Sequence, residues 1–233
     1  MKIFESFNDY IINEGVYDKY IFKAIFLAGG PGSGKSYVSN KTVSGLGVKM
    51  VNSDILYEHL LKKQDMSLNI KNMNPEDFEK AMEIRKKAKG LTEKQLQLYL
   101  DGRLGMVLDG TGKDFNKISN MSDSLKNLGY DTYMIFVNTS LDTALERNEM
   151  RAQEGDRGVP DDIVVKSWKK VQSNMGKFQN YFGTNNFILV DNNNATEDVF
   201  LKVHKRIKNL LNEPVNNYKA KQWIEKELET KKR

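Results

Sequence analysis

Residues 24–36 read AIFLAGGPGSGKS, and this stretch indicates both a fold class and a ligand. Its first five residues are apolar and are followed at once by glycines, which is typical of a short buried strand. Residues 29–36 then fit the pattern GxxxxGK followed by Ser or Thr, and a helical pattern with Val38 and Val43 comes next. The order strand, glycine-rich turn and helix is that of a P-loop, so we expect a nucleotide-binding site here.

The chemistry of phosphate binding explains why these residue types stand at these positions. Glycines let consecutive backbone N–H groups turn inward around a β-phosphate, and the N-terminus of the following helix adds a partial positive charge. Lys35 is predicted to reach the β- and γ-phosphates as a catalytic residue, and the Ser36 hydroxyl to complete the coordination of Mg²⁺. With ATP and Mg²⁺ as expected cofactors, the candidate nucleotide contacts are Gly30, Gly32, Ser33, Gly34, Lys35 and Ser36.

Further apolar runs of strand length follow along the chain. They cover residues 48–52, 106–109, 132–137 and 187–191, and helical patterns separate them. Strands that alternate with helices imply right-handed crossovers and a parallel sheet covered on both faces, with the ligand crevice at the carboxyl ends of the strands. The expected fold class is therefore α/β, a three-layer P-loop NTPase fold with a parallel five-stranded sheet and a helical lid insertion.

The same patterns predict how the chain is divided. Pro75 is expected to open one helix of a long helical insertion, and Thr92 to cap another. The predicted parts are an N-terminal helix over 1–21, a P-loop kinase domain over 22–212 with a helical insertion over 57–103 and an arginine lid over 141–160, and a C-terminal helical tail over 213–233.

Composition excludes several classes of site. The 233 residues carry a net charge of +5, contain no cysteine and contain 2 histidines, so neither a disulfide framework nor a thiolate or histidine zinc centre is expected. No apolar run approaches the roughly 20 residues that a membrane span needs, and the N-terminus carries acids where a signal peptide would be cationic. We expect no membrane partner and a cytoplasmic protein, in a bacterium or a phage-infected host.

Two aspartates follow predicted strands directly. Asp54 can accept a proton from an incoming hydroxyl if its strand lies in the central part of the sheet, or it can act as the N-cap of the next helix. Asp109 ends its strand in the arrangement that orders Mg²⁺ in P-loop proteins, although an aspartate before glycine is also common in turns. Thr111 is a further candidate for contact with the acceptor.

Two arginines share one face of a predicted helix after the fourth strand. Arg147 and Arg151 are four residues apart, so their guanidinium groups can together clamp the β- and γ-phosphates and neutralise charge that develops during transfer. Solvated ion pairs with Glu146 or Glu154 are the alternative. Arg157, in a glycine-rich link that suits a lid hinge, is either a third phosphate contact or an exposed side chain.

With these motifs in view, the chain resembles the phage-type polynucleotide 5′-kinases and the related zeta-toxin-like P-loop kinases over about residues 22–195. The similarity rests on GGPGSGKS, on VNSD at 51–54, on LDGTG at 108–112 and on LERNEMRAQEGDRGVPDDIVVKSW at 145–168. It implies an adenylate-kinase-like core that binds ATP-Mg²⁺, Asp54 as general base toward a hydroxyl acceptor, Arg147 or Arg151 as lid arginine, and a phage or bacterial source.

The chain departs from this resemblance on the acceptor side. Polynucleotide kinases carry an arginine shortly after the base aspartate to hold the acceptor phosphate, whereas residues 55–59 contain none. The insertion over 57–103 is also longer than their acceptor region. The acceptor is therefore left open by the resemblance.

Three functions remain at this level. The first is an ATP-dependent kinase that phosphorylates a hydroxyl on a nucleic-acid 5′-end, a nucleotide or a nucleotide sugar. The second is a nucleoside monophosphate kinase, whose acceptor arrives ionised and needs no base, so that Asp54 favours the first. The third is an ATP-binding regulatory module that switches partner contacts through its terminal helices.

Overall fold

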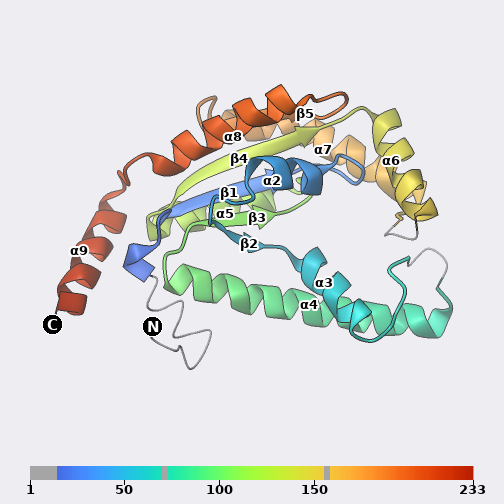
Figure 1. Cartoon of the computed structure of the whole chain (residues 1–233), viewed down its shortest axis with the longest axis horizontal. Helices are drawn as coiled ribbons and strands as arrows, with labels where there is room; N and C mark the ends of the chain where they lie inside the picture. The colour runs from blue at the N-terminus through green and yellow to red at the C-terminus, as the bar shows by residue number, and fades with distance from the viewer. Residues whose placement is uncertain (1–14, 70–72, 155–157, 233) are drawn as a thin grey trace.

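The computed structural model describes residues 15–69, 73–154 and 158–232, and within them the chain forms a five-stranded parallel sheet (Figure 1). The strands are β1 (Lys23–Ala28), β2 (Lys49–Val51), β3 (Met106–Asp109), β4 (Asp131–Asn138) and β5 (Phe187–Asp191). They lie in the order β2-β3-β1-β4-β5, and each neighbouring pair is parallel. The predicted fold class is confirmed, with the strand that leads into the P-loop at the centre.

All five apolar runs form strands, with bounds that differ from the predicted ones by no more than one residue at either end. The position of β2 was the open point, because a reach from Asp54 to the P-loop was tied to a central place for this strand. It lies instead at the edge of the sheet, and β3 separates it from β1. Asp54 is therefore separated from β1 and its P-loop by β3, and its charge acts on Asp109 at the end of that strand.

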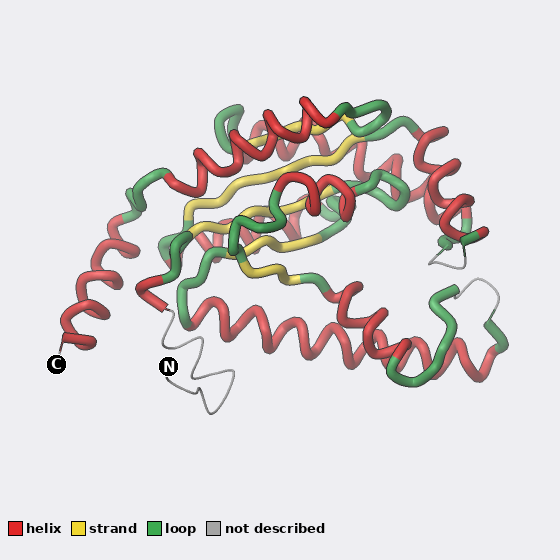
Figure 2. The backbone as a smooth tube through the Cα atoms, viewed as in Figure 1, coloured by secondary structure: helices red, strands yellow, loops and turns green. Residues whose placement is uncertain are grey.

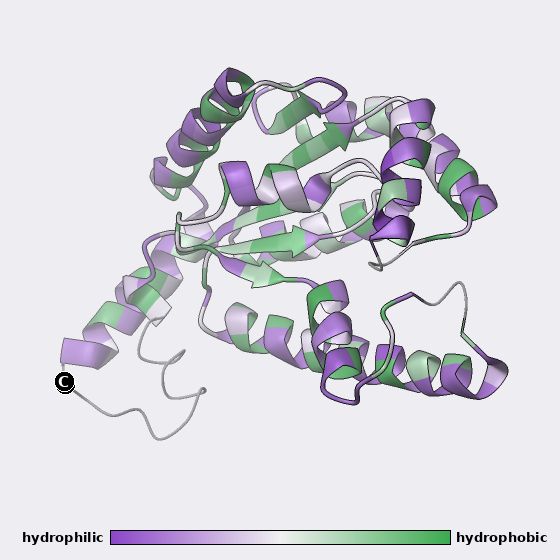
Figure 3. Ribbon diagram, turned by 45° about the vertical axis from the view of Figure 1, so that its right-hand side comes forward, coloured by the Kyte–Doolittle hydropathy of each residue, from purple (hydrophilic) through white to green (hydrophobic). Residues whose placement is uncertain are grey.

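Helices lie on both faces and beside one edge of this sheet. They are α2 (Lys35–Thr42), α3 (Ser53–Lys62), α4 (Pro75–Asp101), α5 (Phe115–Leu128), α6 (Leu141–Gln153), α7 (Asp161–Phe182), α8 (Glu197–Asn212) and α9 (Tyr218–Lys232). The strands are mostly hydrophobic in Figure 3, whereas the helices carry hydrophilic residues between their apolar ones. This distribution is expected for a sheet buried between two layers of amphipathic helices.

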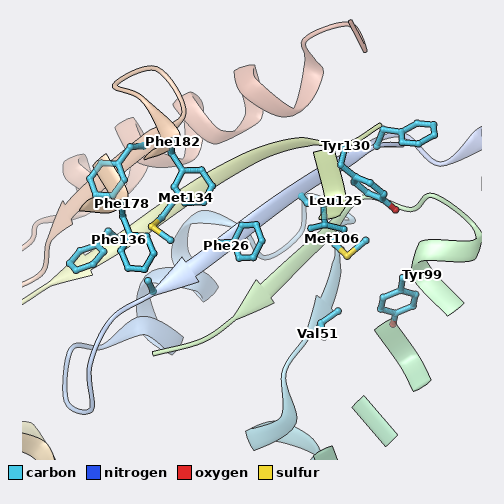
Figure 4. Close-up of a cluster of buried hydrophobic side chains, with 14 of the residues drawn as sticks. Phe26, Val51, Tyr99, Met106, Leu125, Tyr130, Met134, Phe136, Phe178 and Phe182 are labelled. Carbon is cyan, nitrogen blue, oxygen red and sulfur yellow. The ribbon is translucent and has the colours of Figure 1, made fainter. Parts of the chain in front are cut away.

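Alternate side chains of β1 enter two separate cores. Phe26 contributes to the core beneath α5 and α7, where Phe136, Phe178 and Phe182 also pack (Figure 4). Leu27 points to the opposite face and packs in the core that α2 and α8 cover. The three layers hold the carboxyl ends of the strands in fixed register, which is the condition for a rigid site at that edge.

Helices α3 and α4 form an arm that extends beyond the edge strand β2 (Figure 2). They bury a small core of their own, which includes Tyr57, Leu61, Ile84 and Ala88. Pro75 is the first residue of α4, as predicted, and the Asn74 side chain caps this helix. The prediction that Thr92 caps a separate helix is wrong.

Thr92 lies in the interior of α4, which is a single helix of 27 residues. Its hydroxyl donates a hydrogen bond to the carbonyl oxygen of Ala88, four residues earlier, at 2.9 Å. This bond is one that threonine makes inside helices, so a threonine in a helical pattern does not by itself mark a helix start.

Residues 15–17 and helix α9 lie at the opposite end of the sheet from the P-loop (Figure 1). The helix predicted over residues 1–21 falls largely outside the described residues, and the described part contains a 3₁₀ helix, η1 (Gly15–Tyr17). Helix α9 packs Trp223 edge-on against Phe22 with ring centroids 5.6 Å apart. Among the described residues, no helix is long and apolar enough to cross a membrane.

Candidate active site

The P-loop wraps tightly between β1 and α2. Gly32 and Gly34 have φ angles of 73° and 78°, in the left-handed region that glycine adopts without strain. A β-carbon at Gly32 would lie 2.1 Å from the carbonyl oxygen of Ala144, so this position also excludes a side chain sterically. Asn192 donates from Nδ2 to the carbonyl oxygen of Ser33 at 2.8 Å, which ties the loop after β5 to the P-loop.

Lys35 and Asp109 face each other at the end of the central strands. The Lys35 Nζ and Asp109 Oδ1 atoms are 3.8 Å apart, and the two side chains are only 17% and 11% exposed. Asn52 donates from Nδ2 to Asp109 Oδ2 at 2.6 Å, because the residue after Val51 on β2 lies opposite Asp109 on β3. Asp109 is thus oriented from two sides by residues of two other elements.

Burial raises the pKa of the Asp109 carboxyl above its ordinary value of 3.8, and the Asp54 charge raises it further, while Lys35 and the Gly110 backbone N–H lower it. Its Oδ1 atom is buried and accepts no hydrogen bond from the described residues. A buried carboxylate oxygen without a donor is suited to a hard cation, and Ser36, in the first turn of α2, adds a hydroxyl. These residues fit Mg²⁺, although no group of three or more acidic or histidine side chains gathers as a metal site within the described ranges.

Asp54 is the second residue of α3, and it does not cap this helix as one prediction had it. The cap is Asn52, whose Oδ1 accepts hydrogen bonds from the backbone N–H groups of Asp54 at 2.7 Å and Ile55 at 3.3 Å. Asn and Asp are nearly equal N-caps, so the sequence could not choose between them. The Asp54 side chain is 49% exposed, and its Oδ1 lies 3.7 Å from Nη2 of Arg85 on α4.

The predicted arginine helix is α6, and its two arginines differ in their surroundings. Arg147 donates from Nη2 to the carbonyl oxygens of Asn192 at 2.8 Å and Asn193 at 3.3 Å. Its Nη1 is buried and has no hydrogen-bond partner in the described part of the chain. Arg151 is partly exposed. Arg157 lies outside the described residues.

A cavity of about 380 Å³ lies between the P-loop, α6 and the loop after β5. Its lining includes Gly34, Tyr37, Arg147, Arg151 and Asn194. The cavity borders the phosphate-binding loop and offers an aromatic ring, two guanidinium groups and asparagine amides. It can therefore hold the nucleoside part of a nucleotide whose phosphates lie on the P-loop.

A second cavity, of about 440 Å³, has Asp109 in its wall. We call it the acceptor cavity, and its apolar lining consists of Phe26, Leu27, Val51, Leu96, Leu108, Ile118 and Met121. Ser53, Thr111, Lys113 and Lys117 add polar groups. The first cavity is lined by Gly34 of the P-loop, and the second by Asp109, whose carboxylate faces Lys35.

The structure brings most of the predicted residues together at one edge of the sheet. Asp109 interacts electrostatically with both Lys35 and Asp54, and Arg147 lies beside Gly34. Sequence reasoning missed Asn52, Arg85 and Asn192. The first stands in a motif that was already singled out, whereas the other two carry no local signal, because their partners lie 31 and 159 residues away in the chain.

Comparison with known proteins agrees with this geometry. A curated relative, the cytidylate kinase of Sulfolobus acidocaldarius (strain ATCC 33909), is 24% identical over 160 residues, which is 68% of this chain and 76% of that protein. Among solved structures, a gluconokinase from Sinorhizobium meliloti 1021 superimposes with a TM-score of 0.50 at 14% identity, covering 82% of this chain and 94% of that one. The AvrRxo1-ORF1:-ORF2 complex with ATP gives a TM-score of 0.55 at 15% identity over 78% of this chain and 61% of that one.

The zeta toxin family model matches residues 21–202, which is well over half of the chain and includes the P-loop, Asp54, Asp109 and α6. Kinases are found both among the curated relatives and among the structural neighbours, so the chain is an ATP-dependent P-loop phosphotransferase. By the extent of the family match, it belongs to the zeta toxin family.

Proposed function

We propose that this protein transfers the γ-phosphate of ATP to a hydroxyl group of an acceptor bound in the acceptor cavity, with Asp54 as general base. The observation that carries this proposal is the placement of Asp54. Asn52 caps α3, so the Asp54 carboxylate is not used as a cap. Asp54 also follows Ser53, which lines the acceptor cavity, and the Asp54 charge acts on Asp109. A carboxylate at this position can take the proton that a hydroxyl loses as it attacks phosphorus.

ATP is held in this proposal by groups on both sides of the P-loop. The backbone of residues 30–36 and Lys35 bind the β- and γ-phosphates, and the nucleoside part lies in the cavity beside Tyr37 and Arg151. Ser36 and Asp109 would hold Mg²⁺, which would neutralise charge on the phosphate oxygens. Arg147 or Arg151 adds positive charge near the γ-phosphate during transfer.

The transfer forms one bond to phosphorus, breaks one and moves one proton. The acceptor oxygen forms a bond to the γ-phosphorus, the bond between that phosphorus and the bridging oxygen of ADP breaks, and the hydroxyl proton passes to Asp54. Lys35 stabilises the charge that builds up between the β- and γ-phosphates, for which it is placed at the first position of α2. The reaction needs no further reactant.

A nucleoside monophosphate kinase is the second candidate. The similarity to a cytidylate kinase favours it, as does the Arg85 guanidinium beside Asp54, since an acceptor phosphate is anionic. Asp54 opposes it, because an ionised phosphate oxygen has no proton to lose and is repelled by a neighbouring carboxylate. We therefore rank the hydroxyl acceptor first.

Incubation with ATP labelled at the γ-phosphate tests the choice directly. The acceptor panel contains 5′-hydroxyl oligonucleotides, nucleotide sugars and nucleosides on one side, and nucleoside monophosphates on the other. The proposal predicts label on a hydroxyl oxygen of one class. Label on the phosphate of monophosphates, with every hydroxyl acceptor unlabelled, would replace it by the second candidate.

A further inference from the structure

One wall of the acceptor cavity is an apolar part of the sheet. Val51 on β2, Leu108 on β3 and Phe26 on β1 are partners across three neighbouring strands, and we call these three residues the apolar row. All three line the cavity, and they pack in or against the core beneath α5 and α7, of which Figure 4 labels Phe26 and Val51. Side chains at one register position share a face of a sheet, so the apolar row forms a continuous apolar surface.

Two helices add further apolar side chains to this cavity. Leu96 comes from α4, and Ile118 and Met121 come from α5. Thr92 of α4 also lines the cavity, but its hydroxyl already donates a hydrogen bond to the carbonyl oxygen of Ala88 at 2.9 Å. The helices therefore offer mainly apolar contacts, around a volume of about 440 Å³ that is typical of small-ligand sites.

The loop after β3 lines the cavity as well, but other parts of the chain use its polar groups. The carbonyl oxygen of Thr111 accepts a hydrogen bond from the Gly29 backbone N–H at 3.2 Å. Asn174 donates from Nδ2 to the carbonyl oxygens of Gly112 at 3.1 Å and Lys113 at 2.9 Å. A ligand with many hydroxyl groups would give up hydrogen bonds to water in this cavity and find few replacements.

Two hydroxyl groups of the lining lie beyond the apolar row. Ser53 follows β2 and Thr111 follows β3, so both stand at the carboxyl ends of their strands. The bond from Gly29 joins this end of the cavity to the start of the P-loop. Lys113 and Lys117 also belong to the lining, but their side chains are exposed and their charges solvated. The cavity thus has an apolar part and, nearer the P-loop, a part with hydroxyl groups.

We propose that the acceptor is an alcohol with an apolar body, aromatic or aliphatic, and that this body fills the acceptor cavity. The inference rests on the proposed function and narrows its acceptor class. The body lies on the apolar row, and the hydroxyl group lies near Ser53 and Thr111. The alcohol oxygen bonds to the γ-phosphorus, ADP leaves and the hydroxyl proton passes to Asp54. Each buried CH₂ group strengthens binding roughly fourfold, so the cavity selects against polyhydroxylated compounds.

Binding of naphthylmethanol tests the cavity. This probe carries fused apolar rings and a single hydroxyl group, whereas xylitol carries hydroxyl groups without an apolar body. Each is titrated into the full chain saturated with a non-hydrolysable ATP analogue and Mg²⁺. We expect saturable binding of naphthylmethanol that is tighter than that of xylitol by about tenfold or more. No saturable binding of naphthylmethanol, or a smaller difference from xylitol, would overturn the proposal.

Three variants assign the binding to this cavity. Leu96→Gln places a polar group in the α4 wall and should weaken naphthylmethanol binding by about tenfold or more. Thr92→Phe puts a ring where the ligand would lie and should weaken it too. This variant adds apolar surface, so it keeps the test valid if Leu96→Gln does not fold. The matched control is Leu91→Gln, because Leu91 is 39% exposed on the same helix and lines a different groove, and it should bind like the wild type.

Wild-type affinity in either folded cavity variant, or equal weakening in the Leu91→Gln control, would show that naphthylmethanol binds elsewhere and would overturn the assignment.

Transfer of label from ATP labelled at the γ-phosphate separates this inference from the proposed function. Naphthylmethanol should be labelled about tenfold faster than xylitol or more, and Leu96→Gln should remove this preference. Equal or faster labelling of xylitol would overturn the inference and leave the proposed function standing, since a hydroxyl group is still phosphorylated. Binding of naphthylmethanol without label would also overturn the inference. The proposed function itself fails only if its own panel labels monophosphates and no hydroxyl group.

Discussion

In the proposed mechanism, Lys35 stands beside Asp109 before any nucleotide binds. Its Nζ atom lies 3.8 Å from Asp109 Oδ1 in a largely buried site, and the surrounding P-loop glycines fix the start of α2. A cation held next to the carboxylate that we propose for Mg²⁺ would need little reorganisation when the β- and γ-phosphates arrive. Such preorganisation is the main source of electrostatic stabilisation in phosphoryl transfer.

Lys35→Ala is predicted to remove most of the phosphotransfer while the protein stays folded. The change deletes one charge directed at the β/γ-phosphates, and loss of such a contact lowers turnover on the order of 10²–10³ or more. The measurement is kcat with ATP together with circular dichroism of the variant. A folded variant with the turnover of the wild type would contradict the assignment of Lys35.

Asp109→Asn is predicted to stabilise the protein without ligands and to inactivate it. Burial raises the pKa of Asp109, so the folded state holds this proton more tightly than the unfolded state, and the stability of the wild type falls as the pH rises from the ordinary value of 3.8 through the raised one. Asparagine does not ionise, can still accept the hydrogen bond from Asn52 and escapes this loss. The variant should be inactive because Mg²⁺ binding needs the carboxylate.

Thermal unfolding between about pH 3 and pH 7, without nucleotide or metal, measures this difference. The gain in melting temperature of Asp109→Asn over the wild type should be present at neutral pH and vanish at the acid end. A variant that is less stable than the wild type at neutral pH would show that attraction to Lys35 outweighs the desolvation of Asp109.

Helix α6 carries two arginines at the site and also holds the loop after β5. Arg147 joins α6 to the loop after β5, and Asn192 in that loop holds the P-loop. Arg151, one turn later, lines the cavity between the P-loop, α6 and the loop after β5. The two arginines that looked equivalent in the sequence therefore differ in what they support.

Both Arg147→Ala and Arg151→Ala are predicted to lower kcat more than they weaken ATP binding, because a lid arginine acts mainly on charge that develops in transfer. Arg147→Ala should in addition lower the melting temperature, since it frees the loop at Asn192 and Asn193. Arg206→Ala is the matched control, because Arg206 also holds a loop through Nη2, by a bond to Thr184 O, but at the other end of β5. If both variants keep kcat, the arginines are structural.

The long helix α4 shows where local reasoning stops. Thr92 was expected to cap a separate helix, yet α4 is continuous across Gly90 and Thr92 because Ala81, Ile84 and Ala88 pack against α3. Tertiary packing outweighs the roughly 1 kcal/mol that a glycine costs inside a helix. The packing of α4 against α3 also brings Arg85 close to Asp54.

For the whole molecule, the sequence predicted what is encoded locally. The P-loop, the five strands and the parallel sheet follow from short runs of residues, and the structure confirms them. The order of the strands depends on contacts between distant segments, so the edge position of β2 was not predictable. The links from Asn192 to the P-loop and from Arg85 to Asp54 are likewise long-range. The acceptor side of the site is therefore visible only in the folded chain.

The proposal that a hydroxyl is the acceptor depends most on Asp54, and Asp54→Asn tests it directly. The change removes the base but keeps the size of the side chain, and the cap of α3 is unaffected because Asn52 provides it. Loss of the exposed pair with Arg85 costs about 0–1 kcal/mol, which lowers the melting temperature by at most about 4 °C. Asp198→Asn is the matched control, since Asp198 is also the second residue of its helix and also pairs with a basic side chain, Lys202.

The measurement is the rate of phosphoryl transfer from ATP to the labelled acceptor, alongside ATP affinity and melting temperature, for the wild type and both variants. We predict that Asp54→Asn binds ATP-Mg²⁺ nearly normally and loses roughly 10² or more in transfer rate, while Asp198→Asn transfers like the wild type. Clear destabilisation of Asp54→Asn with transfer largely intact would contradict the role of Asp54 as a base and with it the hydroxyl acceptor.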